Sequence, residues 1–305
     1  MKKKDILHQT CFKMDLDVVI SSRKDREIRK KLLKPGDFNI VPYEDAKCKI
    51  LLSDVTFTNN IHGVGEEDTS RYLDPDFDGN MTVGDCDNYI DRDIDLLVQQ
   101  MCKGQECLAT IVYKNNEDKL AKQVDFKLEL LEASEEDLIG DWPMERLYET
   151  ACLHKTRGVE LIKEKRIGDG FRRFNKALKL LIAIDPIEAD EPPDDKWIPI
   201  LSKLYSNLAH CQLHYEEYEA ALILCERALA SDQNNIKAMY RKSSANIGLK
   251  QYAEAWNDIQ NLLKLDPNNA PAHEKAKFLR PKIDKITKDY NDVVKKMFGV
   301  KSTLK

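Results

Sequence analysis

The chain has 305 residues, of which 42% are hydrophobic and 33% are charged, and its formal net charge is −5. This length predicts two domains. No run of about 18 apolar residues occurs, and residues 1–6 lack the apolar stretch of a signal peptide, so we expect neither export nor a membrane segment. The eight cysteines include no Cys-x-x-Cys pair, which favours reduced thiols in the cytoplasm, with the nucleus as a second compartment.

The first part of the chain, residues 1–135, has the pattern of a β-sheet. Residues 124–130 alternate apolar and polar side chains, and short β-rich runs lie at 49–52 and 108–113. They predict strands of one antiparallel sheet. Acidic residues interrupt the basic stretch at 23–31, which favours a solvated segment over a nucleic-acid site. The organisation changes between Ser134 and Trp142.

One acidic motif in this part matches a calcium-loop template. Asp74, Asp76, Asp78 and Asp85 have the spacing of a twelve-residue loop, in which carboxylates two residues apart can converge on one cation. However, Asp85 stands where a longer, bidentate glutamate is usual, and Pro75 does not suit such a loop. We favour a solvated loop before a strand, with no metal, and keep a calcium-responsive scaffold as an alternative.

The second part contains a helical repeat. A small residue, an aromatic residue and a second small residue recur after 34 residues: Ala209, Tyr218 and Ala221, then Ser243, Tyr252 and Ala255. Thirty-four residues is the tetratricopeptide (TPR) period, and small residues are needed where two antiparallel helices cross closely. The repeat predicts an all-α solenoid from residue 143 to 305, with repeats at about 148–182, 200–234 and 235–268. In the first repeat Gly158 takes the small position.

A C-terminal helix is expected at about residues 272–298, with Pro281 near its start. Its apolar residues are spaced three and four apart and predict one stripe: Ile283, Ile286, Tyr290, Val293 and Met297. We favour a stripe that caps the solenoid. The same spacing suits a coiled-coil seam, so we expect a monomer or a weak dimer.

Four polar residues of the repeats are expected to share one groove. Lys237 and Arg241 lie four residues apart and project from one helix face. Asn207 lies one period before Arg241, and Lys155 lies three residues before the small position of the first repeat. A basic, amide-bearing pocket of this kind suits a pair of carboxylates, such as a terminal carboxylate beside an acidic side chain. The alternative for each cation alone is a solvated helix face.

These residues resemble the carboxylate clamp of co-chaperones that bind the acidic C-terminal tails of Hsp90 and Hsp70. Lys155 matches the family's lysine in the first repeat, Asn207 its asparagine in the second, and Lys237 and Arg241 its pair in the third. Val159 replaces a further asparagine of many clamps, as in large immunophilins. The acidic insert at 184–199 and the ending at 296–299 also resemble FKBP-type immunophilins and the FKBP-like protein.

The first part resembles the FKBP-type prolyl isomerase domain, at residues 82–107 and 124–131. That family's pocket has a tryptophan floor preceded by a valine-isoleucine pair, and aligned here are Ile94 and the pair Ile90-Asp91. The family's tyrosine-glycine flap has no counterpart between Tyr113 and Val124. Because isomerisation requires a twisted amide in a dry, shaped pocket, the resemblance implies a fold without catalysis.

The expected protein is therefore α+β: an FKBP-like antiparallel sheet with a short helix, then a TPR solenoid of three repeats and a capping helix. The resemblance implies a noncatalytic co-chaperone without a cofactor, which binds an Hsp90 or Hsp70 tail and a client. The implied clients are kinases or receptors, among them a casein kinase of the circadian clock. A residual prolyl isomerase is the alternative. His210 and His214 could hold a metal, but we favour a packed or exposed pair.

Overall fold

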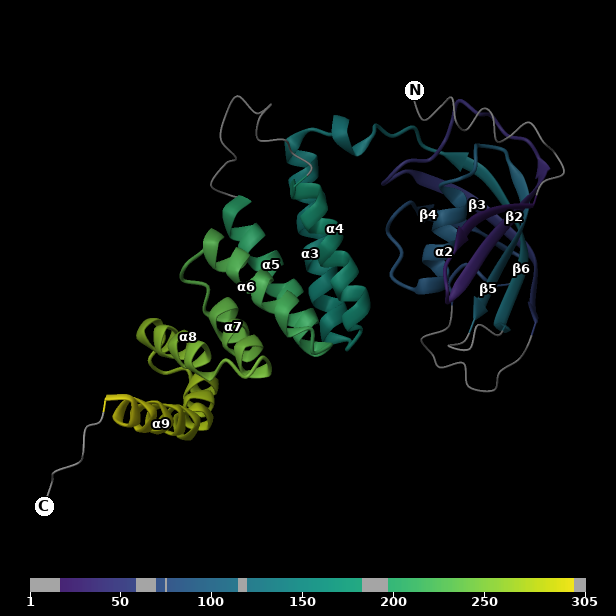
Figure 1. Cartoon of the computed structure of the whole chain (residues 1–305). Coiled ribbons are helices and arrows are strands. Elements are labelled where there is room, and N and C mark those ends of the chain that lie inside the picture. Colours follow the sequence, from purple (N-terminus) through teal and green to yellow (C-terminus); the bar gives the residue numbers. More distant parts are fainter. Residues whose placement is uncertain (1–16, 59–69, 75, 115–119, 183–196, 299–305) are drawn as a thin grey trace, which may run out of the picture. The chain divides into compact units, whose positions relative to one another are not determined.

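The computed structural model describes residues 17–58, 70–74, 76–114, 120–182 and 197–298. The chain divides into two compact units, Met1–Trp142 and Pro143–Lys305 (Figure 1). The division falls at the end of the stretch where the sequence pattern changes from strands to helices. Each unit is described by itself below.

The first unit is an antiparallel sheet with the strand order β1-β2-β5-β6-β3-β4. The strands are β1 (Asp17–Ser22), β2 (Arg26–Lys34), β3 (Lys47–Thr58), β4 (Phe77–Thr82), β5 (Glu106–Lys114) and β6 (Leu120–Ala133). The alternation at residues 124–130 buries one face of β6 completely, because successive side chains of a strand point to opposite faces. The expected antiparallel sheet is confirmed.

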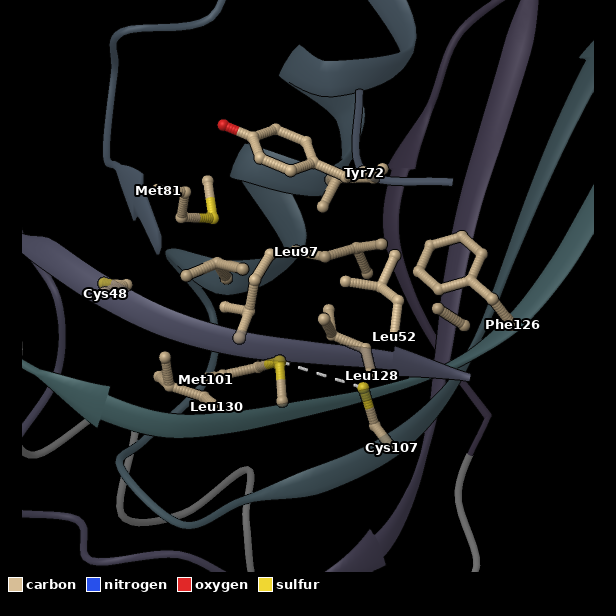
Figure 2. Close-up of a cluster of buried hydrophobic side chains, with 14 of the residues drawn as sticks. Cys48, Leu52, Tyr72, Met81, Leu97, Met101, Cys107, Phe126, Leu128 and Leu130 are labelled. Atoms are coloured by element: carbon tan, nitrogen blue, oxygen red, sulfur yellow. Dashed lines mark hydrogen bonds between the residues drawn. The ribbon is translucent and has the colours of Figure 1, made fainter. Parts of the chain in front are cut away.

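Helix α2 (Tyr89–Val98) covers the buried face of this sheet. Its side chains at positions 90, 94, 97 and 98 are fully buried, which is the spacing of a single apolar helix face. Asn88 begins the helix, because its side-chain oxygen accepts a hydrogen bond from the backbone N–H of Ile90 at 2.8 Å. Figure 2 shows Leu97 of this helix among core residues that include Leu52 and Leu128.

The second unit consists of seven helices among the residues that the structure describes. They are α3 (Met144–Lys163), α4 (Ile167–Ile182), α5 (Trp197–His214), α6 (Tyr218–Ser231), α7 (Ile236–Gly248), α8 (Tyr252–Leu265) and α9 (Ala270–Phe298). The first six form three helix pairs, as the TPR period predicts. None of the described helices is both long enough and apolar enough to cross a membrane.

The small positions lie where the paired helices cross. Gly158 of α3 faces Phe174 of α4 so closely that a Cβ atom on the glycine would lie 2.6 Å from the ring. Ala209 and Ser243, which follow in the next repeats, are fully buried. The backbones therefore approach closely at each crossing, which is the packing expected for TPR helix pairs.

Two expectations for the last helix are wrong. Pro281 lies inside α9 instead of near its start. Asn269 is the residue that begins the helix, because its side-chain oxygen accepts from the N–H of Ala272 at 3.1 Å. Ala272 and Leu279 are fully buried against α8, so they provide the capping contact. The expected capping stripe is largely exposed instead, at Ile286, Tyr290, Val293 and Met297.

Candidate functional site

A pocket of about 460 Å³ lies in the helical unit and is lined mostly by α3, α5 and α7, the first helices of the three pairs, with Phe174 of α4 and the turn before α7 beside them. All four residues expected to share a groove line it: Lys155 from α3, Asn207 from α5, and Lys237 and Arg241 from α7. The structure thus brings together side chains that are up to 86 positions apart in the sequence.

Arg241 is the most constrained of these four residues. Its Nη1 donates to Ser206 Oγ at 2.5 Å and lies 3.5 Å from Asn207 Oδ1. Burial lowers the pKa of the guanidinium. Within the described part of the chain no carboxylate forms an ion pair with it. A buried cation with only neutral partners is costly, and an incoming anion would offset that cost.

The two lysines of the site are also available to a ligand. Neither Lys155 nor Lys237 forms an ion pair with a carboxylate of the described residues, and Lys237 is exposed. Val159 lines the pocket at the position where many clamps have an asparagine, so one amide donor is replaced by an apolar side chain. The pocket therefore presents three cations and one amide to a ligand at these positions.

The sequence reasoning did not assign the other lining residues to the groove: Ile162, Lys163, Phe174, Lys203, Ser206, His210, Asp232 and Asn235. Two of them had a usable signal. Lys203 lies 34 residues before Lys237, and His210 lies three residues after Asn207 on the same helix face.

His210 was paired in the sequence with His214 as a possible metal ligand. The structure instead places His210 half-buried in the pocket, while the ring of His214 packs edge-on against Tyr215 with the centroids 5.3 Å apart. The pKa of His210 is lowered by burial and, to a smaller extent, by Arg241 and His214. The described residues contain no group of three or more His, Cys, Asp or Glu side chains that could hold a metal ion.

The sheet unit has a different environment where the resemblance places the isomerase pocket. Ile90 and Ile94 are fully buried members of the core. The next charged residue, Asp91, is buried as well and accepts from Ser70 Oγ at 2.5 Å, with Arg71 at 3.6 Å. Burial raises the pKa of Asp91. Residues 115–119, where the family's flap was expected to be missing, lie outside the described residues.

The calcium-loop template does not fit the structure. Phe77–Thr82 form the edge strand β4, which pairs with β3 instead of winding around a cation. Asp78 lies within this strand, 3.4 Å from the ammonium of Lys49. A strand fixes the backbone in an extended form, so the carboxylates at 74–85 do not form the compact cage that calcium requires.

Comparison with known proteins finds relatives of this chain. The family described as "BDBT FKBP like N-terminal" matches residues 22–135. The mouse FK506-binding protein-like is 31% identical over 135 residues, which is 44% of this chain and 36% of that protein. FK506-binding protein 59 of Drosophila melanogaster is 23% identical over 276 residues, 87% of this chain and 58% of that protein. This chain has an FKBP-like N-terminal domain followed by a TPR domain.

A solved structure shows the same fold. The crystal structure of residues 1–211 of CG17282 superimposes with a TM-score of 0.52 at 20% identity, covering 65% of this chain and 95% of that chain. The chain spans 36% and 58% of the lengths of the two curated relatives.

Proposed function

We propose that this protein is a co-chaperone scaffold whose TPR groove binds the acidic C-terminal tail of Hsp90 or Hsp70. The observation that carries the proposal is the guanidinium of Arg241, which is partly buried, lines the pocket and has only neutral partners among the described residues. A carboxylate that reaches this group forms an ion pair with it, whereas Ser206 and Asn207 provide only neutral acceptors.

Each residue of the groove has a distinct part in this proposal. The three cations, Lys155, Lys237 and Arg241, face the two negative charges of a terminal aspartate, its side chain and its α-carboxylate. Asn207 supplies an amide donor beside Arg241. Because Val159 removes one donor relative to many clamps, we expect a weaker affinity than those clamps show, with a Kd of about 1–100 μM.

The sheet unit acts in the proposal as a noncatalytic client-binding domain. Ile94 replaces the aromatic floor of the isomerase pocket, and the carboxylate of Asp91 is buried beside it. The client we propose is a kinase, because the sequence resembles the insect immunophilin bride of doubletime, which partners a casein kinase of the circadian clock. The proposed compartment is the cytoplasm, with access to the nucleus.

The decisive experiment is calorimetric titration of the full chain with the Hsp90 peptide SRMEEVD. The same peptide with an amidated C-terminus tests the terminal carboxylate, and the variant Lys237→Glu/Arg241→Glu tests the groove. Both changes are expected to abolish binding, because each removes or reverses charge at the site. Lys285→Glu/Lys288→Glu is the matched control, since it makes the same charge change on an exposed part of α9. It is expected to bind like the wild type.

Two results would overturn the proposal. One is no binding of SRMEEVD by the wild-type chain. The other is an equal loss of affinity in the groove variant and the α9 control, which would mean that only net charge matters. In either case the groove serves another ligand, which pull-down with the full chain would have to identify.

The proposed lack of catalysis needs a test of its own. We expect no turnover of a proline-containing peptide above the uncatalysed rate, because the pocket floor is Ile94 and a buried carboxylate lies next to it. Turnover that an immunophilin inhibitor suppresses would contradict this expectation and favour the alternative, a residual prolyl isomerase.

A further inference from the structure

Lys203 of α5 repeats the clamp lysine one period earlier. It lies 34 residues before Lys237, as Asn207 lies 34 residues before Arg241. Each lysine is followed four residues later by its polar partner, so each pair projects from one face of its helix. Both lysines line the pocket. The clamp resemblance assigns no function to Lys203.

Hydrogen bonds between α5 and α7 hold these two faces side by side. Ser202 Oγ donates to the carbonyl of Ala228 at 2.9 Å and accepts from Asn235 Nδ2 at 2.8 Å. Asn235 in turn begins α7, because its Oδ1 accepts from the N–H of Ala238 at 3.0 Å. Both Ser202 and Asn235 lie close in sequence to the lysines, so the two lysine-bearing turns are adjacent.

A second contact lies one helical turn further along. There, Arg241 Nη1 donates to Ser206 Oγ, which is buried. The two contacts fix the register of α5 against α7, with Lys203 and Lys237 on the pocket side between them. Two ammonium groups on neighbouring helices repel each other, and this repulsion is relieved when an anion lies between them.

The charges that line the pocket exceed what two carboxylates can offset. Five cationic side chains line it: Lys155, Lys163, Lys203, Lys237 and Arg241. The one acidic lining residue is Asp232, whose Oδ1 accepts from the backbone N–H of Asn234 at 3.0 Å and so holds the turn before α7. None of the four lysines forms an ion pair with a carboxylate in the described parts of the chain. A ligand with only two charges leaves several of these cations uncompensated.

We propose that Lys203 and Lys237 form a second anion subsite, which binds an acidic side chain upstream of the terminal carboxylate pair. The preferred partner is therefore a C-terminal tail with at least three carboxylates, two at its last residue and one or more before it. This inference rests on the proposed function, because it assumes that a tail occupies the groove.

The test is a double-mutant cycle by calorimetry on the full chain. The peptides are SRMEEVD and its single variants SRMQEVD and SRMEQVD, and the proteins are wild type, Lys203→Ala, Lys203→Arg and Lys179→Ala. Lys179 is the matched control, because it is exposed on α4 and lies outside the pocket lining. Lys203→Ala is expected to weaken binding of SRMEEVD by about two- to fivefold, the range for an exposed ion pair. Lys203→Arg is expected to keep the affinity.

The decisive result is the coupling free energy between the substitution in the protein and the substitution in the peptide. Wild type and Lys179→Ala should prefer SRMEEVD over one of the two glutamine peptides, and Lys203→Ala should lose that preference. If Lys203→Ala keeps the preference, or binds as Lys179→Ala does, the subsite is wrong while the clamp remains. If wild type binds none of the peptides, the proposed function fails and the subsite fails with it.

Discussion

In the sheet unit, the buried carboxylates of α2 have partners within the protein, whereas the partly buried guanidinium of Arg241 in the TPR groove has only neutral ones among the described residues. Asp93, which is nearly inaccessible to solvent, pairs with Arg26 and accepts from the hydroxyl of Tyr113 at 3.0 Å. Asp95 accepts from the backbone N–H of Gly84 at 3.1 Å. Arg241 is partly buried, and its guanidinium contacts a hydroxyl and an amide oxygen.

The presence or absence of an oppositely charged partner distinguishes charged groups that stabilise the fold from charged groups that are free to bind a ligand. A buried ion pair is expensive to break, because removal of one partner leaves the other without compensation. A buried cation without an anion already bears that cost in the free protein. Perturbed ionisable groups occur in both units, so the partners of each group, more than its shift in pKa, indicate which is structural.

The largest effect is expected from Asp93→Ala in the sheet unit. The variant leaves Arg26 and the hydroxyl of Tyr113 buried without their partner, so it should lower the free energy of unfolding by about 3–5 kcal/mol. Hydrogen exchange of β2 and β5, followed by mass spectrometry, measures the loss within this unit.

A compensated variant checks the cause. Arg26→Met/Asp93→Leu/Tyr113→Phe replaces all three polar groups by apolar ones and should recover most of the stability, because no polar group is then left unpaired. If the amides of β2 and β5 are as protected from hydrogen exchange in Asp93→Ala as in wild type, the ion pair does not stabilise the sheet. The contrast with the groove then disappears.

Arg241→Met should behave in the opposite way. It removes an uncompensated cation, so the stability should fall by no more than about 1 kcal/mol, the net value of the lost hydrogen bond to Ser206. Binding of SRMEEVD should weaken by at least about thirtyfold, since a charge pair buried with a ligand is worth about 2–5 kcal/mol. Urea unfolding followed by the fluorescence of buried Trp197, beside calorimetry, measures both.

The double variant Arg241→Met/Ser206→Ala sharpens this result. It removes the orphaned hydroxyl and should be at least as stable as wild type. A loss of more than about 2 kcal/mol in Arg241→Met would show that the guanidinium is a structural residue. The groove would then resemble the sheet unit instead of contrasting with it.

The fold followed from the sequence because its signals are periodic. The alternation at residues 124–130 predicted the buried face of β6, and the 34-residue spacing predicted the helix pairs. The calcium template and the placement of Pro281 near the start of α9 failed for the same reason. Aspartates at 74–85 and Pro281 were interpreted locally, whereas strand pairing with β3 and packing of Ala272 against α8 decide the structure there.

The groove was only partly predictable. Its four expected residues follow from register, since positions one period apart lie on the same wall. Ser206 could not be found this way, because its contact with Arg241 depends on the packing of α5 against α7. Lys203 has the right register, but a lysine on a helix is usually solvated, and the pocket lining is what distinguishes it.

A smaller effect is expected from His210, which makes the affinity of the groove for its ligand depend on pH. In the free protein its pKa lies below the ordinary value because of burial, then of Arg241 and His214. A bound carboxylate pair offsets the positive charge of Arg241 and raises the pKa of His210, so binding takes up protons. The affinity for SRMEEVD should therefore increase as the pH falls from 8 to 5.5, by at most about tenfold for each unit by which the pKa rises.

Calorimetry at several pH values tests this linkage. His210→Gln should flatten the pH dependence, while His214→Gln, one turn away, should keep most of it. The carboxylates of the peptide titrate equally with every variant, so the difference between the two curves isolates His210. An affinity that is equally dependent on pH in wild type and His210→Gln would contradict a role of this residue in the groove.

The smallest effect is expected where a neutral group lacks a partner. Ser243 is fully buried at a helix crossing, and its hydroxyl has no hydrogen-bond partner among the described residues. Alanine occupies the same position of the preceding repeat, at Ala209. Ser243→Ala should therefore raise the free energy of unfolding by about 1 kcal/mol, because it removes a desolvated hydroxyl without leaving a large cavity.

Ser202→Ala is the matched control, since this buried hydroxyl bonds both the carbonyl of Ala228 and the amide of Asn235. It should lower the free energy of unfolding by about 1–3 kcal/mol. Urea unfolding of both variants shows directly whether each substitution raises or lowers the free energy of unfolding. If Ser243→Ala lowers the free energy of unfolding by a similar amount, the hydroxyl of Ser243 has a hydrogen-bond partner in solution, such as a buried water. The lack of a protein partner for a buried hydroxyl in this solenoid would then not indicate a loss of stability.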